Sequence, residues 1–148
     1  MNKLLLIFII LLATTITVQA VEANVEVKVT VLPAYRLSLD INTINKIVFT
    51  GDKLFFIVDL KKKDLTKLSN KIYVDLNYEI LKGKKVVKSG FLETTPLIKR
   101  NIEVLNVRIP DDFNPGNYEL KVTASNPQSY PASDKDKFVV MKHFKFKF

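Results

Sequence analysis

The chain has 148 residues, of which 47% are hydrophobic, and it carries a formal net charge of +8. This length allows one ordinary domain with a hydrophobic core, and this composition argues against intrinsic disorder. Because the chain has no cysteine and a single histidine, it lacks the residues for disulfides, thiol chemistry and the usual zinc, haem and iron–sulfur sites.

The first 20 residues have the pattern of a secretory signal peptide. Lys3 gives a positively charged start, residues 4–13 form an unbroken apolar run, and Val18-Gln19-Ala20 places small residues at a cleavage position. The apolar run is shorter than the roughly 20 residues that a membrane-spanning helix needs. We therefore predict a signal peptide over 1–20, one mature domain over 21–148 and a secreted or cell-envelope location, with an uncleaved N-terminal membrane anchor as the alternative.

The mature region begins with apolar residues that alternate with polar ones. Val25, Val27, Val29 and Val31 lie on one side of a predicted strand, Pro33 interrupts it, and residues 37–41 resume the alternation. Because proline cannot donate to a neighbouring strand, this pattern predicts an edge strand that is split in two.

The remaining segments also have the period of β-strands. Residues 53–61 are apolar on both faces at their start, which predicts a central strand, and a polar loop follows over 64–70. The clearest stripe is at residues 72–80, and Lys82-Gly83-Lys84 predicts a tight turn into a strand over 86–94 that Pro96 ends. Further strands are predicted at residues 102–109, 118–125 and 137–148. Seven or eight such strands without a helix predict an all-β, antiparallel sandwich.

Residues 109–122 contain the most specific local motif. A strand ends at a proline, crosses over through Asn114-Pro115-Gly116 and restarts at Tyr118. This arrangement resembles the tyrosine corner of immunoglobulin-like sandwiches, and Gly51-Asp52-Lys53-Leu54 resembles the start of the second strand in bacterial and archaeal modules of that kind. The resemblance covers about residues 25–148 and is to the broad group of fibronectin type III, macroglobulin-type and cell-adhesion-related envelope domains. It implies that the Tyr118 hydroxyl caps an upstream backbone group, and it implies a binding or structural role rather than catalysis.

No residue pattern indicates an enzyme, a cofactor or a metal site. His143 shares the outward face of the predicted last strand with Lys145 and Lys147, which is typical of a solvated side chain. No serine has the surroundings of a nucleophile. The acidic groups lack the spacing of a calcium loop, so we interpret them as turn residues. They are Asp111, Asp112, Asn114 and Asn117 at the crossover, and Asp134 with Asp136.

Two further features are candidates for binding. The tail residues Phe144, Phe146 and Phe148 alternate with lysines and either complete the sandwich or add a strand to a partner's sheet. Two lysine groups flank successive loops and either converge into one basic patch or lie at two separate ends of the sandwich. The groups are Lys61, Lys62 and Lys63, and Lys82, Lys84 and Lys85.

We therefore expect an exported structural or protein-binding module whose partner is another envelope or surface protein, contacted through sheet edges or loops. The alternative is a carbohydrate- or anionic-polymer-binding domain with Tyr35, Tyr73, Tyr78 or Tyr130 as aromatic platforms. Nucleic acid is not an expected partner, because an exported chain with only three arginines is poorly suited to read phosphates and bases. A membrane is expected only if the N-terminal segment is retained. Sugar binding predicts two or three exposed aromatics in one groove, whereas protein binding predicts an exposed apolar strand edge.

Overall fold

The computed structural model describes residues 34–65 and 70–143. The predicted signal peptide, the predicted strand at residues 25–31, most of the predicted 64–70 loop and the phenylalanines Phe144, Phe146 and Phe148 lie outside the described residues. Over the described ranges the chain forms β1 (Tyr35–Thr43), β2 (Ile47–Phe49), β3 (Lys53–Asp64), β4 (Ile72–Lys82), β5 (Lys85–Leu97), β6 (Arg100–Arg108), β7 (Gly116–Ser125), β8 (Ser129–Tyr130) and β9 (Ala132–Met141).

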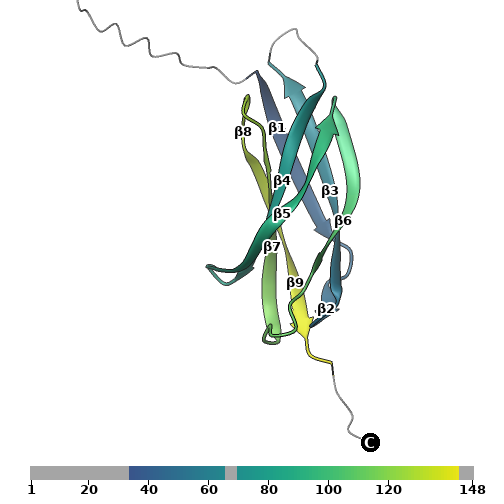
Figure 1. The fold of residues 1–148 in the computed structure, drawn as a ribbon, viewed down its shortest axis with the longest axis vertical. Coiled ribbons are helices and arrows are strands. Elements are labelled where there is room, and N and C mark those ends of the chain that lie inside the picture. Colours follow the sequence, from purple (N-terminus) through teal and green to yellow (C-terminus); the bar gives the residue numbers. More distant parts are fainter. Residues whose placement is uncertain (1–33, 66–69, 144–148) are drawn as a thin grey trace, which may run out of the picture. The chain divides into compact units, whose positions relative to one another are not determined.

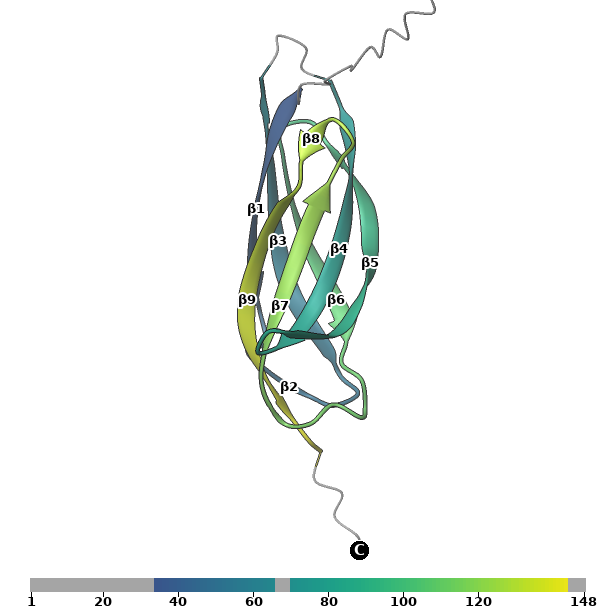
Figure 2. The ribbon, with the colours of Figure 1, turned by 90° about the vertical axis from the view of Figure 1, so that its left-hand side faces the viewer.

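The strands form two sheets that pack as a β-sandwich (Figures 1 and 2). Sheet A has the order β6-β3-β1-β8, and sheet B has the order β2-β9-β7-β4-β5. The alternation in the sequence decides which residues fill the space between them, because side chains along a strand point to opposite faces. The predicted stripe of β4 is buried throughout, and Leu54, Phe56 and Leu120 are among the side chains with no exposed surface.

Several predicted features are confirmed, with corrections. β3 lies between β6 and β1, so its central position is confirmed, but Phe55 is 40% exposed, so only one face of the strand is buried. The Lys82-Gly83-Lys84 turn is confirmed, and Gly83 has the positive φ of 63° that this turn requires. Pro96 does not end its strand as predicted, because β5 continues to Leu97 as the outer strand of sheet B, where proline is tolerated.

The prediction of a purely antiparallel sandwich is wrong, because two pairs of strands are parallel. β1 pairs with β8, and β2 pairs with β9, in parallel registers of two and three residue pairs. β2 and β8 are too short for a period to show in the sequence, so the prediction missed both. The edge position predicted for the first strand is wrong only where β8 pairs with Tyr35 and Arg36, because among the described strands the rest of β1 pairs with β3 alone.

The first and last strands change sheets together. The chain passes from β1 in sheet A to β2 in sheet B, and, through Pro131, from β8 in sheet A to β9 in sheet B. The two short parallel ladders therefore leave a gap between them, where β1 faces β9 with no strand pairing. We call this gap the β1–β9 seam.

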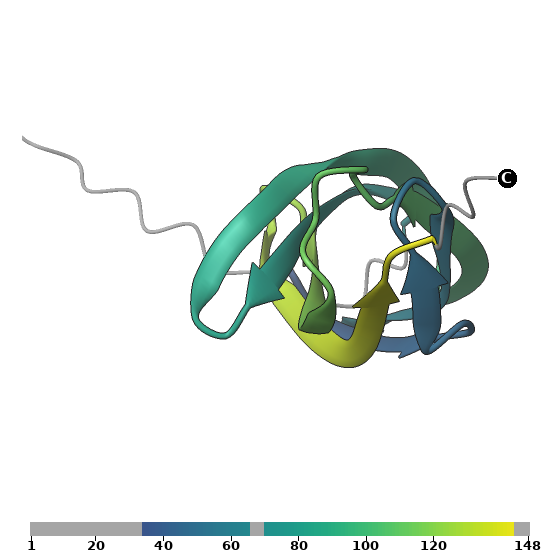
Figure 3. The same cartoon turned by 90° about the horizontal axis from the view of Figure 1, so that it is seen from below.

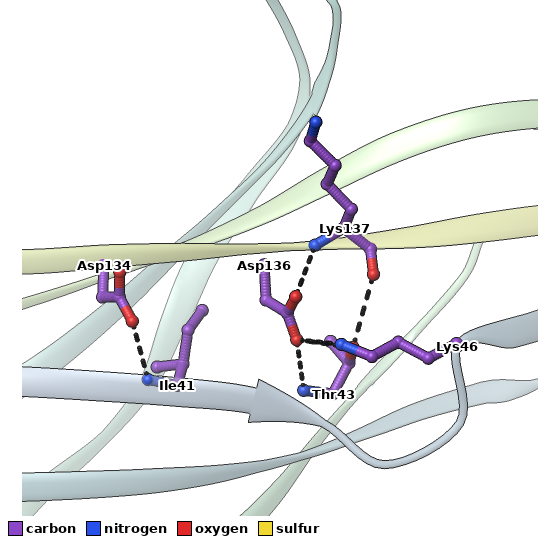
Figure 4. Close-up of polar contacts among 6 residues, drawn as sticks. All are labelled: Ile41, Thr43, Lys46, Asp134, Asp136 and Lys137. Carbon is purple, nitrogen blue, oxygen red and sulfur yellow. Dashed lines mark hydrogen bonds and ion pairs between the residues drawn. The ribbon is translucent and has the colours of Figure 1, made fainter.

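Two aspartates close the β1–β9 seam (Figure 4). The Asp134 carboxylate accepts a hydrogen bond from the Ile41 backbone N–H at 2.9 Å, and Asp136 accepts one from the Thr43 N–H at 2.7 Å. Asp136 also accepts from the Thr43 hydroxyl at 2.8 Å and forms an ion pair with Lys46. These aspartates lie inside β9, so our interpretation of them as turn residues is wrong. Their side chains replace the backbone acceptors that a neighbouring strand would supply.

Candidate interaction surfaces

The outer face of sheet A carries a contiguous group of apolar side chains. Phe55 and Ile57 on β3 point outward, as do Ile102 and Val104 on β6, and Ile57 lies directly opposite Val104 in the register. Ile102 is 54% exposed and Val104 is 60% exposed. We call these four residues the apolar patch. Single exposed apolar residues are ordinary, whereas large contiguous apolar patches are typical of interaction sites.

The backbone of β6 has a free edge beside this patch. The N–H and carbonyl of Ile109 both bond to the β2–β3 turn, at Asp52 and Gly51, each at 2.9 Å. The backbone N–H and carbonyl groups of successive residues point to opposite edges of a strand. Those of Ile109, and of every second residue before it in β6, therefore point toward β3. The backbone groups of the residues between them, which include Ile102 and Val104, point away from β3. Ile102 and Val104 therefore direct both their side chains and their backbone groups toward surfaces that no described strand of sheet A covers.

Charged side chains border the patch at one end. Arg100 donates two hydrogen bonds to Asp59, both at 2.8 Å, and Lys61 lies 3.1 Å from the same carboxylate. Hydrogen bonding from Arg100, more than the opposing effect of burial, lowers the pKa of Asp59 to about 2. Asp59 therefore stays ionised, and the Arg100 side chain is held against the sheet.

A pair of acidic residues lies between β5 and β6, which are the outer strands of the two sheets. Glu103 on β6 accepts hydrogen bonds at Oε1 from Thr95 and Asn101, whereas its buried Oε2 accepts none from these donors. Hydrogen bonding to Glu103 raises the pKa of Glu93 on β5 to about 7, with burial as a second cause, and the same contact lowers the pKa of Glu103. Below about pH 7 Glu93 is therefore protonated and can donate to Glu103, which stays ionised.

The predicted lysines do not form one basic patch. Lys62 is buried, donates to the Asn70 carbonyl at 2.6 Å and pairs with Asp64 at 2.8 Å, so it is not a surface charge. Lys61 and Lys63 are exposed at the end of β3, beside the start of β1. The other group, Lys82, Lys84 and Lys85, is exposed at the turn between β4 and β5, at the opposite end of the strands (Figure 1).

The tyrosines do not form a shared aromatic groove. Tyr35 and Tyr78 are buried, and burial raises the pKa of Tyr78. Tyr73 and Tyr130 are exposed, but the depression that Tyr73 lines contains no other exposed aromatic side chain. Its remaining lining includes the polar residues Lys71, Asp75, Asn126 and Gln128. Sugar binding predicts a groove with two or three exposed aromatics, and protein binding predicts an exposed apolar strand edge. The described residues show the second feature, at β6.

The corner residues are built into the end of the sandwich. The Tyr118 hydroxyl donates to the Asn114 carbonyl at 2.7 Å, and the buried ring stacks between Phe113 and Phe138. Gly116 has a φ of 139°, which favours glycine, and it follows Pro115 directly at the start of β7. This is the contact that the resemblance to a tyrosine corner implies, so these three residues hold the crossover in place.

The described ranges contain no group of three or more histidine, cysteine, aspartate or glutamate side chains placed to hold a metal ion. His143 is exposed, lies 3.5 Å from Asp52 and stacks on Phe49 with ring centroids 4.7 Å apart. No helix in residues 34–65 and 70–143 is long and apolar enough to cross a membrane.

Comparison with known proteins gives the fold class. No protein-family model matches the chain, and no curated protein matches it in sequence. Among solved structures, the chain is similar to a CARDB domain from Pyrococcus furiosus solved in complex with di-metal ions, at 13% identity over 78% of this chain and 99% of that chain, with a TM-score of 0.47. It is also similar to part of the alkylpurine DNA glycosylase AlkC from Pseudomonas fluorescens, at 13% identity over 73% of this chain and 30% of that chain, with a TM-score of 0.52.

A third similarity is to part of a β-glucosidase from Listeria innocua, at 11% identity over 74% of this chain and 16% of that chain, with a TM-score of 0.48. At such identities the similarity to solved structures shows the fold alone. The protein is therefore an all-β domain of two packed mixed sheets. The described core and the similarity to the glycosylase agree on this class, and neither assigns a ligand.

Proposed function

We propose that the protein is an exported module that binds another protein through the apolar patch and the free edge of β6. The single observation that carries this proposal is that Ile102 and Val104 have both exposed apolar side chains and backbone groups with no neighbouring strand among the described residues. Their side chains are more than half exposed, and their backbone groups face away from β3. An extended segment added along β6 would satisfy these backbone groups, and its own outward side chains would pack beside Ile102 and Val104 at the border of the patch.

The partner that fits this edge is an extended segment of a different protein. A second copy of the chain fits poorly, because an antiparallel pairing of two β6 strands centred on Val104 places Arg100 of one copy opposite Arg108 of the other. Like charges directly opposite each other in a sheet are destabilising. The N-terminal pattern of residues 1–20 supports export of the module, and the carbohydrate-binding alternative lacks a shared groove of exposed aromatics.

The proposal is tested by capture and by hydrogen exchange. The processed protein, recovered after export, serves as bait for native envelope extract, together with Val104→Ser and with Ile47→Ser as a matched control. Ile47 is 56% exposed on β2, so it removes a comparable apolar surface from sheet B. We expect one partner that Val104→Ser loses and Ile47→Ser keeps.

In the purified complex, the backbone amides of Ile102 and Val104 are expected to exchange more slowly than in the free protein. A partner that both variants capture equally, or a complex in which these two amides keep their free exchange rates, would contradict binding at β6. A dimer of the protein alone that Val104→Ser abolishes would show that the edge serves self-association instead.

A further inference from the structure

The turn between β4 and β5 forms a second exposed surface, separate from the apolar patch. Residues 82–88 contain Lys82, Lys84, Lys85 and Lys88 and no acidic residue. The register runs from Lys82 opposite Lys85 to Ile80 opposite Lys88, with Gly83 at the turn. A Cβ placed on Gly83 would meet no atom within 4 Å, so the turn stands in open space, as Figures 1 and 3 show.

Two valines are exposed beside these lysines. A β-bulge interrupts the register, because Leu81 pairs with Val86 and Ile80 pairs with Lys88, which leaves Val87 without a direct partner. Consecutive residues of a regular strand point to opposite faces, but Val86 is 43% exposed and Val87 is 37% exposed. The hairpin therefore presents two adjacent apolar side chains next to cationic ones.

Little of the lysine charge is neutralised within the described protein. Glu119, the acidic residue opposite Leu81 in the β4–β7 register, is bonded to Lys135 at 3.1 Å. Lys82 lies above the Tyr118 ring at 5.1 Å, and Lys88 donates to the Arg108 carbonyl, which is a neutral acceptor. Lys84 and Lys85 are exposed and have no anionic partner among the described residues.

We propose that this hairpin docks on an anionic lipid bilayer, with the lysines at the phosphate headgroups and Val86 and Val87 inserted among the acyl chains. Charge complementarity supports an anionic partner, since each lysine of a basic segment near an anionic membrane surface adds to the binding energy. The two valines favour a bilayer over a soluble polyanion, because a soluble polyanion offers no apolar phase in which to bury them. This surface is distinct from β6 and does not depend on the protein-binding proposal.

A single-tryptophan probe tests the insertion directly. The chain contains no tryptophan, so Val87→Trp introduces the only one, and Ile98→Trp is the matched control at the other end of the strands, where Ile98 is 58% exposed. With vesicles of phosphatidylglycerol and phosphatidylcholine, we expect a blue-shifted emission from Val87→Trp and an unchanged emission from Ile98→Trp. Equal shifts in both variants, or a shift in neither, would overturn the proposal.

Cosedimentation with the same vesicles tests the charge. Lys84→Ser/Lys85→Ser is expected to weaken partitioning by about 25-fold, at roughly fivefold per lysine near an anionic surface. The control Lys61→Ser/Lys63→Ser removes the same charge from the other end and should weaken it much less. Because all variants share the same N-terminal segment, the difference reports on the hairpin. If both double variants lost the same amount of vesicle binding, the net charge of the protein alone would account for its attraction to the vesicles, and the proposal would be overturned.

The valine substitutions separate a bilayer from a soluble polyanion. Val86→Ser/Val87→Ser is expected to weaken vesicle binding roughly tenfold. Polyphosphate serves as the soluble phosphate probe and should bind the wild-type protein and this variant equally. If the valine variant binds vesicles as tightly as the wild type does, the hairpin recognises phosphate without inserting, and the bilayer proposal fails.

Discussion

Replacing Asp136 with alanine tests how the β1–β9 seam is closed. In the native protein, this carboxylate accepts hydrogen bonds from the backbone N–H and the hydroxyl of Thr43, a residue that is only 2% exposed. Asp136→Ala leaves that buried N–H without its acceptor, at a cost of about 1 to 3 kcal/mol. Burial alone would raise the pKa of Asp136, but hydrogen bonds from Lys46, Thr43 and Lys137 outweigh it and lower the pKa to about 2.

The lowered pKa gives a second magnitude for the same set of hydrogen bonds. A fall from the ordinary value of 3.8 to about 2 makes the ionised form worth about 2 kcal/mol to the folded state. The side chain is 22% exposed, so solvent screens this interaction only in part. Both routes lead us to expect that Asp136→Ala lowers the free energy of unfolding by about 1 to 3 kcal/mol at pH 7, as measured by urea denaturation.

The sign of the pH dependence follows from the lowered pKa. The contribution of Asp136 is complete above about pH 4 and is lost as the pH falls toward 2, because the unfolded chain binds the proton first. The difference between wild type and Asp136→Ala should therefore shrink over that window. Asp112→Ala, at an exposed position, is the control and should change stability by no more than about 0.5 kcal/mol.

Lys46→Ala separates the ion pair from the backbone bond. The Lys46 side chain is 53% exposed, so its pairing with Asp136 is expected to contribute less than about 1 kcal/mol. Were Lys46→Ala to cost as much as Asp136→Ala, the ion pair and not the buried N–H would hold the seam. An unchanged urea midpoint for Asp136→Ala would refute the reasoning altogether.

Three further predictions concern the tyrosine corner at Tyr118, the acidic pair Glu93 and Glu103, and the predicted signal peptide. Tyr118→Phe should cost roughly 1 to 3 kcal/mol, because it keeps the ring but removes the donor to the Asn114 carbonyl; an unchanged urea midpoint would contradict this. Glu93 has a raised pKa of about 7, so the stability that its protonated form contributes is complete below about pH 4.5 and is lost as the pH rises through 7. Glu93→Gln and Glu93→Ala should both flatten that dependence in urea titrations from pH 5 to 8, because each removes the titrating group, and Glu93→Gln, which keeps a donor beside Glu103, should be the more stable of the two. N-terminal sequencing of exported protein should begin at or within a few residues of Val21, and an intact Met1 would indicate the anchor alternative instead.

The core of the sandwich was predictable because alternation is a local property of the sequence. The stripe from Ile72 to Ile80 is apolar at every second position, and all of its inward residues are buried. The turn at Gly83 was predictable for a similar reason, since few residues adopt a positive φ without cost. Both features depend on neighbours within a few positions in the chain.

The apolar patch was misread from a signal that the sequence does contain. Phe55 and Ile57 break the alternation of β3, and we interpreted them as the second buried face of a central strand. β3 is central, but nothing in the described protein covers its outer face, so the same residues form a surface. The period of apolar residues in the sequence cannot distinguish a face that the same chain buries from a face that a partner would bury, because both need apolar side chains at the same positions.

The sandwich has a second seam, between the edge strands β5 and β6, and its comparison with the β1–β9 seam explains why the edge of β6 is exposed. At the β1–β9 seam, the carboxylates of Asp134 and Asp136 accept directly from backbone N–H groups of β1 and so replace a missing strand. At the β5–β6 seam, the acidic side chains bond to each other and to Thr95 and Asn101 instead, and the backbone groups that β6 turns away from β3 receive no such substitute from Glu93 or Glu103. Aspartate and glutamate close both gaps, but only the first closure satisfies the edge of a strand. Of the two edge strands that the structure describes at this seam, β5 and β6, only β6 has unpaired backbone beside the apolar patch, which is why we place partner binding there rather than at β1.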